Sequence, residues 1–189
     1  MKSLDEIALS LQGYDPQSLR MADANAFIAQ LVQPVSGFED VALRQCNGRV
    51  LAQDVVSTMA VPAHDNSAMD GFAFDGSVLN EQATLVLRNA GTALAGKAWS
   101  RKLQPGECLK VMTGAILPAG LDTVVPHEMT TVQSDMVSIP ADRLRLGDNR
   151  RLRGEDLQLG GTALSKGELL TPASLGLAAS LGVQTLPVV

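Results

Sequence analysis

The chain has 189 residues, of which 46% are hydrophobic and only 3% aromatic, and its formal net charge is -5 at pH 7. This length suffices for one large or two small domains, with a core built mainly from Ala, Val, Leu and Met. The acidic balance argues against a general nucleic-acid binder, because the phosphate backbone attracts cationic surfaces.

The chain is predicted to begin with two helices. Residues 1–6 lack the apolar core of a signal peptide, and Ser3 is a candidate cap for a short helix over 4–11. Asp23 is a candidate cap for a second helix that Pro34 ends. The apolar residues at helical spacing in it are Ala24, Phe27, Ile28, Leu31 and Val32. Segments 41–43 and 50–56 then indicate short strands around Asn47-Gly48, which favours a tight reversal, with a helical turn over 44–47 as the alternative.

The middle of the chain is predicted to be rich in strands. Segments 84–88, 108–112, 123–125 and 136–139 are β-like and separated by Gly, Pro and Asp turns. No helical segment between them is long enough for a βαβ crossover, so we do not expect a parallel doubly wound sheet. The tail predicts a strand at 168–170, a helix over 173–181 capped by Thr171, and an extended end over 183–189.

No apolar run approaches the roughly 18 residues of a membrane span. Cys46 and Cys108 are far apart and lack a partner motif, so we expect reduced thiols. Together these features predict a cytoplasmic protein with no membrane or nucleic-acid partner.

Polar groups are concentrated in the string Pro-Ala-His-Asp-Asn-Ser-Ala-Met-Asp-Gly-Phe-Ala at 62–73. Asp65, Asn66 and Ser67 are residue types that cap turns, so the string predicts a turn leading into a strand over 69–74. The alternative is a metal or anion site carried on that turn. Asp65 and Asp70 are hard oxygen ligands that suit Mg²⁺, although five residues apart they need not face one site.

Two further strings carry candidate chemistry. Thr113, in Met-Thr-Gly-Ala at 112–115, follows a predicted strand, where a hydroxyl and a flexible backbone can bind an anion; the alternative is a turn without a ligand. Five arginines lie between 143 and 153, a patch that can clamp phosphate or be neutralised by Glu155 and Asp156. His127 is expected to be structural or exposed, and Glu128 to be a carboxylate that either binds a metal or supports the metal's ligands.

These strings resemble motifs of the molybdopterin molybdenumtransferase family of MoeA and gephyrin. Two further strings share the resemblance, Cys-Asn-Gly-Arg-Val-Leu-Ala at 46–52 and Arg-Leu-Arg-Gly-Glu-Asp at 151–156. The string at 62–73 matches every position of its P-x-x-D-N-S-A-M-D-G-[FY]-A signature. Leu152 stands where relatives often have arginine. The resemblance implies an α+β fold, in which 1–60 and 148–189 form an elongated linker and dimerisation domain and 61–147 an inserted β-rich domain. Relatives continue past Val189 into an α/β molybdopterin-binding domain and a β-barrel, whose motifs do not occur here.

The resemblance implies a role in molybdenum cofactor synthesis, the Mg²⁺-dependent insertion of molybdate into adenylylated molybdopterin with release of AMP. Asp70, Thr113 and Asp156 are then expected in catalysis, with Asp70 and Asp156 also as metal ligands. Arg151, Ser67 and Asp65 are expected to bind substrate. The implied partners are a second copy of the chain, the downstream α/β domain and other proteins of cofactor synthesis, so the chain supplies half of an intersubunit site and is expected to be inactive alone. The alternative is a non-catalytic dimerisation or scaffold module, for which the apolar helix over 173–181 offers a surface.

Overall fold

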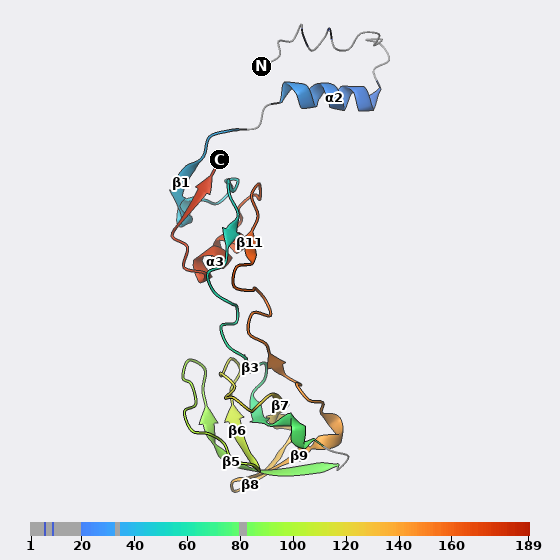
Figure 1. Cartoon of the computed structure of the whole chain (residues 1–189), viewed down its shortest axis with the longest axis vertical. Coiled ribbons are helices and arrows are strands. Elements are labelled where there is room, and N and C mark those ends of the chain that lie inside the picture. The colour runs from blue at the N-terminus through green and yellow to red at the C-terminus, as the bar shows by residue number, and fades with distance from the viewer. Residues whose placement is uncertain (1–5, 7–8, 10–19, 33–34, 80–82) are drawn as a thin grey trace.

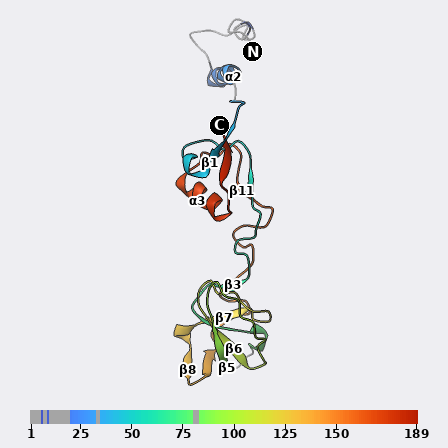
Figure 2. The ribbon, with the colours of Figure 1, turned by 90° about the vertical axis from the view of Figure 1, so that its left-hand side faces the viewer.

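The computed structural model describes residues 6, 9, 20–32, 35–79 and 83–189. The molecule is elongated, with two folded units joined by a pair of chain segments that run side by side in both views (Figures 1 and 2). The predicted helix over 4–11 falls almost entirely outside the described residues. Within the described ranges, no helix is both long and apolar enough to cross a membrane.

Helix α2 spans Met21–Leu31 and lies apart from both units in Figures 1 and 2. The prediction that Asp23 caps this helix was wrong, because the cap position is Arg20 and no side chain caps it. Asp23 instead lies in the first turn, where its carboxylate accepts a hydrogen bond of 2.8 Å from Arg20 Nε. A carboxylate there still suits the positive end of the helix dipole.

The two ends of the chain form the first unit together. Strand β1 (Glu39–Ala42) pairs antiparallel with β12 (Thr185–Val188), and β2 (Val55–Val56) pairs antiparallel with β11 (Thr162–Leu164). Helix α3 (Pro172–Ser180) lies beside them, and its cap Thr171 accepts from the Ser174 N–H at 3.3 Å, as predicted. The hairpin expected around Asn47-Gly48 does not form, because both of its strands pair with the carboxyl-terminal part instead. The helical-turn alternative is closer, since a 3-10 turn, η1, covers Leu43–Gln45.

A hydrophobic core drawn from both chain ends holds this unit together. Its fully buried members include Cys46 and Leu51 from the first part of the chain and Leu170, Leu186 and Val188 from the last. Burial of such side chains supplies about 1.5–3 kcal/mol each, which the isolated end segments would not obtain.

The two segments between the units are tied by backbone hydrogen bonds. Ser57 N–H donates to Gly161 O at 2.8 Å, and Val61 N–H to Leu157 O at 2.8 Å. Below them β3 (Asn66–Ser67) pairs antiparallel with β10 (Arg150–Arg151).

The second unit contains a six-stranded sheet in the order β7-β4-β6-β5-β9-β8. Its strands are β4 (Gly71–Phe74), β5 (Thr84–Ala93), β6 (Glu107–Val111), β7 (Thr123–Pro126), β8 (Thr131–Gln133) and β9 (Met136–Pro140). The 3-10 turns are η2 (Gly76–Val78), η3 (His127–Met129) and η4 (Ala141–Arg143). The four strands predicted here are all present. Neighbours are antiparallel except β5 and β6, which are parallel and joined by 94–106 without a helix.

Each face of this sheet has its own hydrophobic core. Leu109, Val111 and Val124 pack on one face, and Phe74 and Ile139 on the other. Strands buried on both faces explain why so few polar side chains occur within β4, β6 and β7. The fold is therefore mixed and dominated by β-structure, as predicted, with two helices in the part that the structure describes.

Candidate functional site

Asp70 and Thr113 meet at one edge of the six-stranded sheet. Gly71 at the start of β4 lies opposite Val111 at the end of β6, so the residues just outside the two strands become neighbours. Asp70 Oδ1 accepts hydrogen bonds from the Thr113 backbone N–H and from its hydroxyl, both at 2.7 Å. The two catalytic candidates, 43 residues apart in sequence, thus form one polar group.

The Asp70 carboxylate is held in its charged form. The hydrogen bond from the Thr113 backbone lowers the Asp70 pKa most, followed by that from the Thr113 hydroxyl, with smaller help from the charges of His127 and Lys110. Asp70 Oδ2 has no hydrogen-bond partner among the described residues, and the side chain is exposed. One exposed carboxylate oxygen fits Mg²⁺, which commonly takes one or two carboxylates and keeps several waters.

A cavity of about 230 Å³ opens beside Asp70. Apolar side chains of β4, of β8 and of the residue after β6 line it, together with Asp70, Lys110 of β6 and two residues between β7 and β8. The lining residues are Asp70, Gly71, Phe72, Lys110, Met112, His127, Thr130 and Val132. The His127 N–H donates to the Asp70 carbonyl at 3.1 Å, which fixes this corner of the cavity. A larger cavity of about 360 Å³ lies at the other end of β4 and β6 and contains none of the predicted site residues.

Asp65 faces the arginines rather than Asp70. Its Oδ2 accepts from Arg150 Nε at 3.0 Å and from the second guanidinium nitrogen, and its Oδ1 accepts from the Arg153 backbone N–H at 2.7 Å. The hydrogen bond from Arg153 lowers the Asp65 pKa most, followed by that from Arg150. Both carboxylate oxygens are therefore engaged in tying 62–67 to 150–153.

Ser67 lies in the interior of this turn. The residue is 1% exposed, and its hydroxyl donates to the Met69 carbonyl and accepts from the Met69 N–H at 3.3 Å. A hydroxyl used in this way fixes the turn that presents Asp70. Its predicted contact with substrate stays a prediction.

Arg151 and Asp156 form a second polar pair near the junction of the two units. Arg151 bonds Asp156 Oδ1 and, from Nε, Glu155 Oε1 at 3.3 Å, so the acidic neighbours neutralise it as the sequence indicated. These bonds raise the Arg151 pKa, the bond to Asp156 most. Arg151 also pairs with Asn66 of β3, which connects this pair to the segment that carries Asp70.

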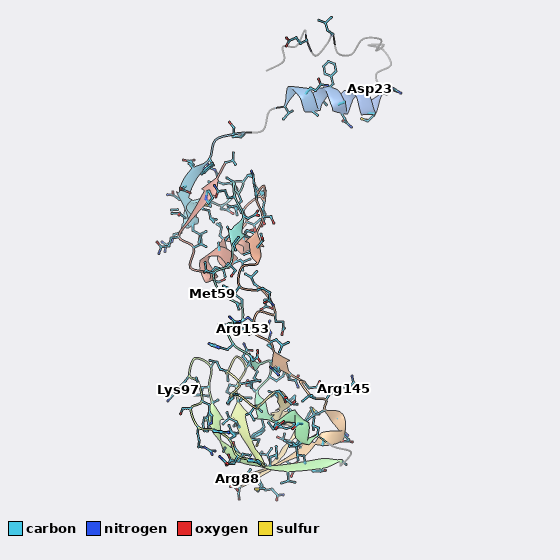
Figure 3. The ribbon with its side chains drawn as sticks, viewed as in Figure 1. Asp23, Met59, Arg88, Lys97, Arg145 and Arg153 are labelled. Atoms are coloured by element: carbon cyan, nitrogen blue, oxygen red, sulfur yellow. The ribbon has the colours of Figure 1, made fainter. Side chains whose placement is uncertain are left out.

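The five arginines do not form one patch. Arg145 lies at the side of the second unit, and Arg153 lies between the units (Figure 3). Among the described residues no three His, Cys, Asp or Glu side chains gather in a metal-binding group. Asp70 and Asp156 thus belong to different clusters, and their shared role as metal ligands stays a prediction.

The sequence predicted Arg150 only as one of five arginines, and it did not predict Lys110 at the site. Arg150 binds Asp65 across 85 positions, and Lys110 reaches the cavity because it lies opposite Phe72 in the β4–β6 register. The only local signal for Lys110 was a charged residue within an otherwise apolar strand that precedes Thr113.

Comparisons with known proteins agree with the motifs. Residues 19–182 match the family model described as MoeA N-terminal region, domains I and II. The chain is 37% identical over 145 residues to a molybdopterin molybdenumtransferase of Haemophilus influenzae, covering 77% of this chain and 35% of that protein. It is 42% identical over 151 residues to molybdopterin molybdenumtransferase 2 of Mycobacterium tuberculosis, covering 78% and 37%.

A solved structure is also similar. The molybdopterin biosynthesis moeA protein of Pyrococcus horikoshii OT3 superposes with a TM-score of 0.78 at 29% identity, covering 83% of this chain and 42% of that one. The chain thus spans between a third and a half of the length of these relatives. The family match over most of its residues shows that this chain belongs to the MoeA N-terminal family.

Proposed function

We propose that this chain is the amino-terminal region of a molybdopterin molybdenumtransferase and supplies half of its active site. The reaction is insertion of molybdate into adenylylated molybdopterin with release of AMP. The Asp70–Thr113 pair is the observation that carries the proposal, since it presents a charged, exposed carboxylate beside a cavity in a member of this family.

The chain's residues would act by positioning and charge compensation. Thr113 holds the Asp70 carboxylate in one orientation, which leaves Oδ2 available for Mg²⁺. Mg²⁺, when bound, neutralises charge on phosphate and oxyanion groups. Arg151 would contact an oxyanion or the phosphate, and Asp156 would contact the metal directly or through water. The bonds of Arg151 to Asp156 and Glu155 would then open to admit substrate.

The remaining half of the site would come from the downstream α/β domain of a second subunit. We propose that residues 1–60 and 148–189 form the dimerising domain and 61–147 the inserted domain. The separate cores of the two units support this division. Exposed apolar side chains on α2, such as Met21 and Ile28, support an association surface. The protein would work in the cytoplasm.

The test is molybdate insertion with adenylylated molybdopterin and Mg²⁺, by this chain alone and mixed with a downstream α/β domain from a relative. Activity in the mixture and none in the chain alone is the expected result. Inactivity of a folded, associated mixture would contradict the enzyme assignment.

The residue-level test is Asp70→Asn in the active mixture. Loss of the charge should lower the insertion rate by about 100-fold, as for other groups that stabilise developing charge. The melting temperature should stay close to that of the wild type, because Asn Oδ1 can still accept from Thr113. Asp142→Asn, at an exposed aspartate of η4, is the matched control and should leave the rate unchanged. Parallel loss of activity and stability in Asp70→Asn would refute the assigned role.

The scaffold alternative is favoured by the exposed apolar surface alone. Sedimentation at several concentrations tests it, since a scaffold should dimerise and yet support no insertion in any mixture.

A further inference from the structure

Lys110 carries a positive charge at the wall of the cavity beside Asp70. The residue lies in β6 between the buried Leu109 and Val111 and is itself half-buried. In the part of the chain that the structure describes, its ammonium takes part in no salt bridge and no side-chain hydrogen bond. An ammonium without an ion-pair partner at the wall of a cavity attracts an anion that enters the cavity.

The surroundings of Lys110 are arranged around the 230 Å³ cavity. Phe72, Met112 and Val132 provide apolar walls. The charged or titratable groups that line it are Asp70, Lys110 and His127, and the Thr130 hydroxyl is already engaged with the His127 carbonyl at 2.8 Å.

Asp70 does not neutralise Lys110. The two side chains interact through space, but no Lys110–Asp70 distance falls within the 4 Å of an ion pair, and Asp70 Oδ1 is satisfied by both Thr113 donors. The ammonium is therefore available to a group that enters the cavity, next to the carboxylate.

We propose that Lys110 binds a tetrahedral oxyanion that enters this cavity beside Asp70 and Thr113. The inference rests on the proposed function in treating the Asp70–Thr113 pair as part of the reacting site. The oxyanion is either molybdate or a phosphate group of the organic substrate, since both are tetrahedral and accept hydrogen bonds from an ammonium. Lys110 would position this group against the carboxylate or its metal.

Isothermal titration of the chain with sodium molybdate and, separately, with inorganic phosphate tests the proposal, with Mg²⁺ present throughout. Lys110→Met keeps the length of the side chain and removes the charge, and should weaken binding of the preferred oxyanion by about tenfold. Lys110→Arg should recover most of the affinity. Lys102→Met removes an exposed charge from the larger cavity of the same unit and should have no effect. The oxyanion whose affinity falls identifies the source.

Three results would overturn the proposal: no binding of either probe by the wild-type chain, unchanged affinity in Lys110→Met, or an equal loss in Lys102→Met.

Trp99 emission during urea unfolding checks that each variant is folded, since Trp99 is the chain's single tryptophan and packs on the core of this unit. Titration needs no turnover. If Lys110→Met weakens oxyanion binding but the mixture shows no insertion, the proposed reaction is wrong and the oxyanion site stands. If the mixture inserts molybdate and Lys110→Met leaves the KM of both substrates unchanged, the reaction stands and the role of Lys110 is wrong.

Discussion

Replacing Asp65 by Asn should destabilise the protein by an amount that depends on pH. Asp65 is 30% exposed and accepts two hydrogen bonds from Arg150 and one from the Arg153 backbone. The amide keeps one acceptor for Arg153 but turns a donor toward the guanidinium. A partly exposed ion pair contributes about 0.2–1 kcal/mol, and weakening the charged acceptor of Arg153 adds about 1 kcal/mol. We expect a loss of about 1–2 kcal/mol at neutral pH, or about 2–8 °C in melting temperature.

The pH dependence provides the sharper test. Because the pKa of Asp65 is lowered in the folded state, its contribution is complete above the unfolded value of about 3.9 and disappears as the pH falls through the folded pKa. The free energies of unfolding of wild type and Asp65→Asn should therefore differ near pH 7 and converge toward about pH 2. Urea unfolding followed by Trp99 emission measures both, with Asp142→Asn as control. A difference that is constant with pH, or absent at pH 7, would refute the ion-pair argument.

Three other variants or treatments test the fold. Gly71→Ala should destabilise by about 3 kcal/mol or more, because a Cβ there would lie 1.9 Å from the Val125 carbonyl oxygen; thermal unfolding measures the loss, and near-wild-type stability would contradict the close approach. Leu170→Ala should destabilise the unit formed by the chain ends by about 2–5 kcal/mol, measured by circular dichroism, and should leave the unfolding transition reported by Trp99 unchanged. If both unfolding transitions shifted together, the two cores would not be separate. Burial raises the pKa of Cys108 to about 12, so alkylation at about pH 8 should spare it until urea unfolds the chain, and rapid native labelling would show that it is accessible.

Local signals in the sequence predicted most of the second unit. Its strands carry β-branched and apolar residues between Gly and Pro turns, and Thr171-Pro172 marked the start of α3. The first unit was predicted less well, because pairing of β1 with β12 joins residues about as far apart as the chain allows. The Asn47-Gly48 turn does occur, with Gly48 at a φ of 78°, but a turn signal does not determine which strands pair across it.

The same limit applies to the site. Asp70 and Thr113 were predicted as separate candidates from their strings, whereas their hydrogen bond depends on the β4–β6 register. The sequence alone also does not indicate which residue forms an ion pair with Asp65. The sequence offers five arginines as possible partners of Asp65. The pairing of β3 with β10 places Arg150, rather than Arg151, beside the Asp65 carboxylate.

The polar string at 62–73 carries two carboxylates with different partners, Asp65 with Arg150 and Arg153 and Asp70 with Thr113. Strand β3 lies between them, so Asp65 reaches β10 on one side while the Ser67 turn sends Asp70 to the end of β6 on the other. The string thus connects the junction of the two units directly to the candidate site. Its two carboxylates should accordingly be separable: Asp65→Asn should lower the melting temperature more than the insertion rate, and Asp70→Asn should do the opposite. If both variants lost stability and activity in the same proportion, the string would act as a single structural element, and the division of roles would be wrong.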